Sequence, residues 1–303
     1  MSEHKETQTG LAALSSSSTL LQASQVFELY MQNESYSPHT VKAFGNDLKL
    51  LGSHIGHNHP IGRISTQDLN AFLEWLRHER GVPCSPKSYA RRVTTLKVFF
   101  KWLHKSGVLP EDPATPVIQH SVEPPLPQVL GEQDLQKAFV VTQSMWAAAK
   151  SDPRPHLLLK LLLETAIKKA ECMEIQLRHI RRDTPDGPVL EIRYDDPRKQ
   201  TKERRLPLSE EIISVLDDYI EAYSPADVLF PCTARNLEYV LTDVAEQAGV
   251  KKGVSFEMLR WTAIVRDYVN GVEETRLRQK LGISPITWQS TGKKVKTLAE
   301  NYQ

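Results

Sequence analysis

The sequence has few cysteines, almost no net charge and no long apolar run. Its three cysteines among 303 residues, Cys84, Cys172 and Cys232, lie far apart without metal-ligand spacing. This excludes a cysteine-bound zinc site and favours a reducing cytosol without structural disulfides. The net charge is only +1, so contacts with nucleic acid would have to come from local basic surfaces. The longest apolar run, Leu157–Leu163, is interrupted by Lys160 and is too short to span a bilayer.

The composition, with 40% hydrophobic and 25% charged residues, is that of a soluble protein of about two domains. Residues 1–20 are polar, and we expect them to form a disordered tail without a signal peptide. We therefore expect a cytoplasmic protein with no membrane partner. Three histidines crowd one predicted loop, His54, His57 and His59. No cysteine or acidic residue is adjacent, so a solvated loop is favoured over a metal site, and no cofactor is expected.

Residues 21–108 are predicted to form a domain of four helices. Their apolar residues recur every three or four positions, the spacing that places them on one helix face. The second helix starts at Ser37-Pro38 and the fourth at Ser85-Pro86, in each case a cap followed by proline at the first helical position. The third helix is expected to begin near Ser65.

The fourth of these helices carries a basic stripe. At about 100° per residue, its apolar residues fall on one side and five basic residues on the other: Lys87, Arg91, Lys97, Lys101 and Lys105. A stripe of this length suits contact with a phosphate backbone. A solvated helix face is the alternative that the pattern alone leaves open.

A linker with six prolines, residues 109–130, separates this domain from a second one over residues 131–303. The second domain is predicted to hold helices over 132–149, 155–165, 256–269 and 273–281, with one more after Ser209 and another from Thr233. Residues 189–194 alternate as a strand and turn at 195–197, and the chain returns as a second strand over 204–208. The predicted fold class is therefore mainly α with a small antiparallel β-sheet.

Five segments carry the most specific patterns in the sequence. Residues 37–48 and 85–103 begin Ser-Pro-His-Thr-Val and Ser-Pro-Lys-Ser-Tyr. Residues 161–171, 199–208 and 255–261 contain Thr-Ala-Ile-Lys, Lys-Glu-Arg-Arg-Leu-Pro-Leu and Glu-Met-Leu-Arg. In this order and spacing they resemble the tyrosine recombinases of the phage-integrase family, in particular Xer-like members. The resemblance implies a four-helix, SAM-like core-binding domain and a mixed α+β catalytic-like domain that close around a duplex.

The resemblance also implies which residues the reaction needs. In the family a tyrosine attacks a DNA phosphodiester, arginines neutralise the transition-state charge, a lysine protonates the leaving oxygen, and histidines complete the site. Two of these positions are retained, the hairpin lysine as Lys199 and the second arginine as Arg260. The other positions are substituted: Lys168 for the first arginine, Glu257, Trp261 and Ile283 where histidines are usual, and Gly292 where the tyrosine should stand.

These substitutions remove most of the expected chemistry. Lys168 keeps a positive charge but loses the bidentate fork of arginine. A carboxylate at position 257, roughly 4–6 Å from a phosphate, costs on the order of a few kcal/mol and opposes the developing charge. The one outside candidate for a nucleophile is Tyr302, ten positions after Gly292. A terminal aromatic ring that packs on the domain is the alternative for Tyr302.

Basic residues remain along the segments that would face DNA. We interpret them as phosphate contacts, together with the stripe on the fourth helix. They are Arg178, Arg181, Arg182, Arg198, Lys199, Lys202, Arg204, Arg205, Lys251, Lys252, Arg260, Lys293 and Lys294.

The leading hypothesis is a sequence-specific double-stranded DNA-binding protein that has lost strand cleavage. It would act on the nucleoid as a regulator or architectural factor of a mobile element. One alternative is an active recombinase with a rearranged site that uses Tyr302, and another is an interaction module that no longer touches DNA. The expected partners are double-stranded DNA, further copies of the chain on DNA, and mobile-element or recombinase proteins. The sequence leaves the oligomeric state open.

Overall fold

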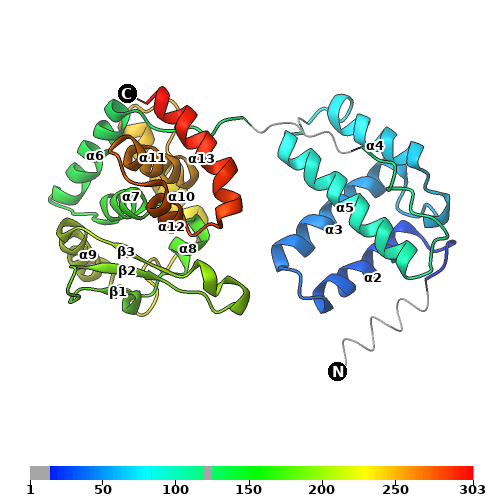
Figure 1. The fold of residues 1–303 in the computed structure, drawn as a ribbon, viewed down its shortest axis with the longest axis horizontal. Helices are drawn as coiled ribbons and strands as arrows, with labels where there is room; N and C mark the ends of the chain where they lie inside the picture. The colour runs from blue at the N-terminus through cyan, green and yellow to red at the C-terminus, as the bar shows by residue number, and fades with distance from the viewer. Residues whose placement is uncertain (1–13, 83, 119–124, 303) are drawn as a thin grey trace. The chain divides into compact units, whose positions relative to one another are not determined.

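The computed structural model describes residues 14–82, 84–118 and 125–302, which form two compact units divided between residues 125 and 126 (Figure 1). Both units are mostly helical, and the second also holds a small antiparallel sheet, so the predicted fold class is confirmed. Within the described residues, no helix combines the length and the hydrophobicity that a membrane crossing requires.

The first unit contains four α-helices and a short 3-10 turn: α2 (Leu20–Asn33), α3 (Pro38–Ile55), η1 (Ile61–Arg63), α4 (Thr66–His78) and α5 (Pro86–Lys105). Each helix begins where a side-chain oxygen accepts a backbone N–H of the first turn. The capping residues are Thr19, Ser37, Ser65 and Ser85. The starts predicted from the Ser-Pro pairs are confirmed, and the apolar faces of the four helices meet in one core.

The boundaries of the first unit differ from those expected at both ends. Residues 1–13 of the expected tail lie outside the described residues. The carbonyl oxygens of Ser16 and Ser18 accept the N–H groups of Gly62 and Ile61 at 2.8 and 2.9 Å, so residues 14–20 belong to the folded unit.

The expected linker is also shorter than 109–130. Leu109, Ala114 and Val117 are buried in the first core, and Leu130 is buried in the second. The apolar residues between the prolines are therefore part of the two units, which the proline content alone did not reveal.

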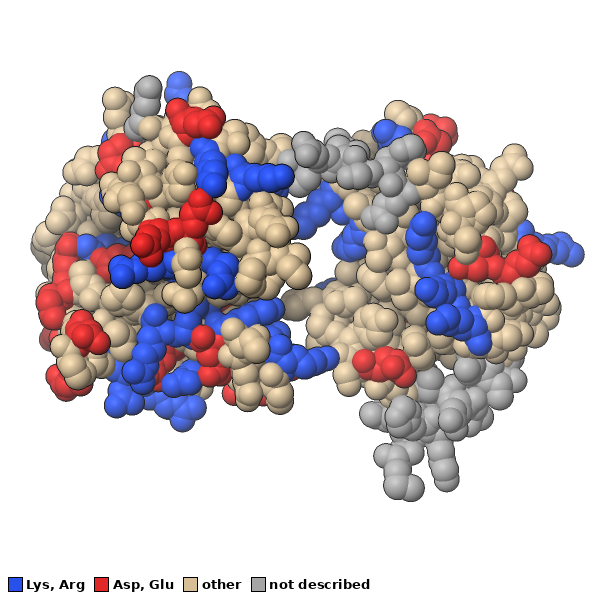
Figure 2. Space-filling view, viewed as in Figure 1, with Lys and Arg blue, Asp and Glu red and all other residues tan. Residues whose placement is uncertain are grey.

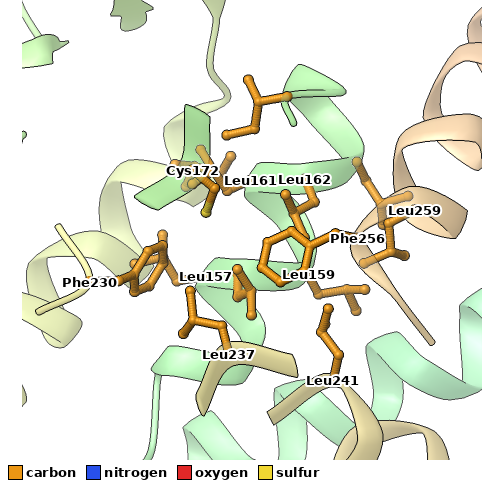
Figure 3. Close-up of a cluster of buried hydrophobic side chains, with 14 of the residues drawn as sticks. Leu157, Leu159, Leu161, Leu162, Cys172, Phe230, Leu237, Leu241, Phe256 and Leu259 are labelled. Carbon is orange, nitrogen blue, oxygen red and sulfur yellow. The ribbon is translucent and has the colours of Figure 1, made fainter. Parts of the chain in front are cut away.

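The second unit contains eight α-helices among the residues that the structure describes. They are α6 (Glu132–Ala147), α7 (Arg154–Thr165), α8 (Lys169–Met173), α9 (Glu210–Tyr223), α10 (Ala234–Gln247), α11 (Phe256–Val269), α12 (Glu274–Leu281) and α13 (Pro285–Glu300). Most residues of α7 are buried, so it lies in the middle of the unit. Its leucines Leu157, Leu159, Leu161 and Leu162 pack among side chains of α10, α11 and the loop before α10 (Figure 3).

The sheet has the strand order β1 (Ile180–Arg181), β2 (Val189–Ile192) and β3 (Arg204–Pro207), all antiparallel. The two predicted strands pair with Leu190 opposite Leu206, and the 3-10 turn η3 (Pro197–Lys202) joins them. Because β2 lies between the other two strands, β3 forms an edge of the sheet beside α12.

The sequence analysis did not anticipate β1 or the last helix, α13. The helix α13 nevertheless starts like α3, with Ser284 accepting the N–H of Thr287 at 3.2 Å and Pro285 at the first helical position. Only Gly292 and Val295 of this helix are fully buried, so it lacks the apolar spacing on which the prediction depended.

Candidate functional site

The second unit buries the carboxylate of Glu171 on α8 among basic and phenolic groups. Its side chain is 2% exposed. It accepts hydrogen bonds from Arg204 Nη1 and Nη2 at 3.1 and 2.9 Å, from the Lys168 N–H at 2.7 Å, and from the Tyr194 hydroxyl. Burial raises the pKa of Glu171, but the hydrogen bonds and charge of Arg204 outweigh it and lower the pKa to about 2. We call these four residues, with Arg260, the Glu171 cluster.

Arg204 connects the β-hairpin to this cluster. Besides Glu171, its Nε donates to the carbonyl oxygen of Lys280 at 2.7 Å, so one side chain ties β3 to α8 and to α12. The sequence analysis placed Arg204 among the phosphate contacts. The structure instead buries it, with 8% of the side chain exposed, and commits its donors to protein acceptors. We therefore no longer count Arg204 as a surface contact.

Arg260, which the sequence resemblance identified with a family arginine, is also bound by protein groups. Its Nη1 donates to the carbonyl oxygen of Ala166, and its Nη2 donates to that of Leu281 at 3.0 Å. Glu171 lies 3.9 Å from Nη1. Burial lowers the pKa of Arg260 to about 10, so it stays charged at neutral pH. Its guanidinium joins the end of α7 to the end of α12.

Of the two lysines that the resemblance identified, Lys168 belongs to the cluster and Lys199 lies beside its member Tyr194. Lys168 Nζ is 3.8 Å from Glu171 Oε1, and burial lowers the pKa of Lys168. Lys199 on η3 is exposed, with Nζ 5.8 Å from the centre of the Tyr194 ring. The sequence analysis did not single out Tyr194, because its position at the end of a strand gave no sign of a buried carboxylate partner.

The substituted histidine positions hold no imidazole group. Glu257 lies exposed in the first turn of α11, one turn before Arg260, whose pKa it raises. Trp261 and Ile283 are half-buried and pack against a cluster of Ala263, Leu277 and other apolar residues. These two side chains therefore serve packing.

The position at which the sequence analysis expected the family's tyrosine holds a glycine in a close-packed environment. Gly292 is buried within α13, and a Cβ atom added there would lie 3.1 Å from Cε2 and Nε1 of Trp288. The Trp288 ring is held in turn, because its Nε1 donates to Glu274 at 2.9 Å. A larger side chain at 292 would therefore have to displace Trp288.

Tyr302, the outside candidate for a nucleophile, lies away from the Glu171 cluster. Its hydroxyl donates to Glu132 Oε2 at 3.3 Å, and Arg266 Nε lies 3.4 Å from the same oxygen. Arg266 follows Arg260 by six positions on α11, which is about 9 Å along a helix. Burial and Glu132 raise the pKa of Tyr302 to about 12. Within one chain, this hydroxyl is not directed at the cluster.

Among the described residues, no group of three or more histidines, cysteines and acidic residues could hold a metal ion. The ring of His54 instead packs 5.0 Å from that of Trp75.

The basic stripe lies on α5. Arg91 donates to the buried carboxylate of Asp47 at 2.8 Å, and Arg92 also lies 3.5 Å from it, so part of the charge of Arg91 is used inside the unit. Lys97 is half-buried, and the other members of the stripe, Lys87, Lys101 and Lys105, are exposed.

Apart from Arg204 and Arg260, the predicted phosphate contacts of the second unit fall into two groups. Some pair with carboxylates: Arg182 with Asp217, Arg198 with Asp196 and Arg205 with Glu191. The others have no carboxylate oxygen within 4.0 Å among the described residues: Arg178, Arg181, Lys199, Lys202, Lys251, Lys252, Lys293 and Lys294. Figure 2 shows lysine and arginine side chains gathered over the sheet and its hairpin.

Both units match known protein families. Residues 25–107 match the phage integrase N-terminal SAM-like domain, and residues 129–287, more than half of the chain, match the phage integrase family. The chain belongs to the phage integrase family. The resemblance expected from the sequence segments is therefore confirmed, and the two matches fall in the two units of the structure.

Its relatives in the phage integrase family include the tyrosine recombinase XerC of Anoxybacillus flavithermus. That protein is 26% identical over 275 residues, which cover 85% of this chain and 87% of the relative. The tyrosine recombinase XerD of Listeria innocua is 23% identical and covers 83% of this chain and 86% of its own length. The similarity therefore extends over both units.

Solved structures show the same phage integrase fold. XerH site-specific recombinase bound to a palindromic difH substrate matches with a TM-score of 0.70 and 16% identity, over 99% of this chain and 92% of that chain. A lambda integrase dimer bound to a COC′ core site matches with a TM-score of 0.70 and 14% identity, over 90% of this chain and 76% of that chain. At this identity the likeness concerns the fold.

Proposed function

We propose that this member of the phage integrase family binds a specific site on double-stranded DNA without cutting it. It would serve as a regulator or architectural factor of a mobile element's recombination machinery. The observation that carries the proposal is Gly292, which is packed against Trp288 at the position where the sequence resemblance leads us to expect the family's nucleophile. Without a hydroxyl there, no covalent DNA intermediate can form at that position.

The surroundings of Arg260 support the same conclusion. Arginines stabilise a phosphoryl transition state by donating to its oxygens. In this chain two donors of Arg260 are bound to the carbonyl oxygens of Ala166 and Leu281. The carboxylate of Glu257 would add repulsion where negative charge develops. The site is therefore suited to hold a phosphate weakly and not to activate it.

DNA binding itself is supported by the two matched domains and by the basic side chains that have no carboxylate partner. The XerH and lambda integrase structures were solved on DNA, and the latter is a dimer. We infer that this chain uses the same broad surface for duplex DNA and that further copies can assemble there.

The proposal is tested by asking whether the protein forms a covalent bond to a DNA strand. A duplex with a nick near the bound site traps a covalent intermediate in an active recombinase, because the released strand diffuses away. We expect no complex that resists SDS with this chain, although the duplex is retained in a native gel. An SDS-resistant adduct that disappears in Tyr302→Phe would instead establish an active enzyme that uses Tyr302, from the same chain or from a neighbouring copy.

The stripe on α5 gives a second expectation. Reversing Lys97 and Lys101 to glutamate should weaken duplex binding by about tenfold or more and lower the salt slope by about two, since each phosphate contact releases about one counterion. The matched control is Lys150→Glu, an exposed residue outside the predicted DNA contacts. Equal affinities of the double variant and the control would show that the stripe is only a solvated face.

A further inference from the structure

A cleft of about 660 Å³ lies between β3 and α12 in the second unit. This volume is within the range of about 300–1,000 Å³ that ligand sites usually have. Its walls include Lys202 and Arg205 from the hairpin, Arg276 and Arg278 from α12, and the half-buried apolar side chains of Val272 and Ile283. Lys202 and Arg205 are also predicted phosphate contacts, whereas Arg276 and Arg278 are not.

The acidic groups of the cleft are already satisfied. Each of its three carboxylates has a cation within 4.0 Å: Glu164 has Lys160 at 3.7 Å, Glu203 has Arg193 at 2.9 Å and Asp267 has Lys280 at 2.6 Å. These groups therefore have little remaining capacity to neutralise other cations.

Three cations of the cleft have no carboxylate partner in the part of the chain that the structure describes. Among the described residues, no carboxylate oxygen lies within 4.0 Å of Lys202, Arg276 or Arg278. Arginine guanidinium groups bind carboxylates through two parallel hydrogen bonds. The cleft thus presents unused positive charge beside an apolar wall.

The edge of β3 offers backbone groups to the same space. Leu208 donates its N–H to the carbonyl oxygen of Pro188 at 2.9 Å. Antiparallel pairs alternate, so Leu206 and Arg204 also bond to β2, whereas Arg205 directs its N–H and C=O to the free side. Pro207 has no N–H to offer there. The edge can therefore form one residue pair with an extended chain, and little more.

We propose that this cleft binds an extended acidic peptide segment of a partner protein. Its carboxylates pair with Arg276, Arg278 and Lys202, its backbone pairs with Arg205, and its apolar side chains contact Val272 and Ile283. Charge complementarity selects this occupant. No aromatic side chain of the described residues lines the cleft, so nucleic-acid bases would find no stacking partner in it.

The test uses the full chain and a fluorescein-labelled octapeptide that alternates glutamate and valine. Fluorescence anisotropy should give a dissociation constant of about 10–100 μM, a value typical of a short peptide with few anchors. A glutamine–valine peptide of the same length should bind at least about tenfold more weakly. Arg276→Glu and Arg278→Glu should each cause a similar loss, while Lys150→Glu should leave binding unchanged. The amide resonance of Arg205 should shift on binding.

Several outcomes would overturn the proposal. These are equal affinity for the glutamate and glutamine peptides, no binding up to about 1 mM, or an Arg205 amide that does not respond. Loss of duplex binding in Arg276→Glu and Arg278→Glu, with peptide binding unchanged, would assign the cleft to DNA instead. A native gel with duplex and the unmodified chain tests DNA binding separately, so failure of one proposal is distinguishable from failure of the other.

Discussion

Replacing Glu171 by glutamine should destabilise the second unit by about 3–5 kcal/mol, the usual cost of leaving a buried charge without its partner. The carboxylate is 2% exposed and holds the fork of Arg204, which is 8% exposed. A neutral amide cannot accept both donors of that fork, and it leaves the charges of Arg204 and Arg260 uncompensated. Urea-dependent hydrogen exchange of the buried α7 amides measures the loss in this unit alone.

Glu238→Gln is the matched control for this substitution. Its carboxylate also pairs with a basic residue, Lys169 at 2.7 Å, but both side chains are nearly half exposed. Exposed pairs contribute about 0–1 kcal/mol, so the control should change stability little. If both variants lost the same amount, the Glu171 cluster would not be the electrostatic centre of the unit.

The stability lost in Glu171→Gln should also depend on pH. The folded pKa of Glu171, about 2, lies below its ordinary value of 4.5, so the folded state binds the proton less readily than the unfolded state. The resulting stabilisation is fully present above pH 4.5, is lost as the pH falls toward 2, and amounts to about 3 kcal/mol. The difference between the unmodified chain and Glu171→Gln should therefore narrow over this acidic range.

Raising the salt concentration from 50 to 200 mM should weaken duplex binding by about 10³–10⁵-fold, if six to ten phosphates are contacted. The chain carries almost no net charge, so this effect has to come from local cations. Enough such cations are exposed without a carboxylate partner on α5, the hairpin, the loop before α11 and α13. A titration by fluorescence anisotropy at several salt concentrations gives the slope directly.

Single lysine substitutions test the contribution of individual phosphate contacts to the salt dependence. Lys251→Ala should reduce the salt slope by about one, whereas Lys150→Ala should leave it unchanged. A slope near zero for the unmodified chain would argue that the protein no longer binds the DNA backbone and would favour the interaction-module alternative.

The sequence predicted the elements that have a local signal. Ser37-Pro38 and Ser85-Pro86 fix the starts of α3 and α5 because the caps act within one turn. The alternation in residues 189–194 predicted β2, although all four residues of Val189–Ile192 are buried. The helix α13 was missed because it contributes little apolar surface to the core, although Ser284-Pro285 carried the same start signal.

The roles of the two arginines could not be predicted from local patterns. Arg204 lies in a basic run that suggests a surface, but its partner Glu171 is 33 positions away. Arg260 binds the carbonyl oxygen of Ala166 across 94 positions. Burial and hydrogen-bond partners of this kind depend on packing between elements, which spacing along the chain does not encode.

Pro207 has a consequence for the protein at high concentration. Open strand edges allow copies of a protein to stack into fibrils, because each new strand finds a row of backbone groups to pair with. On β3 that row is interrupted after a single residue, and the strand itself is only four residues long. The sheet can therefore remain uncovered in solution without acting as a template for amyloid growth.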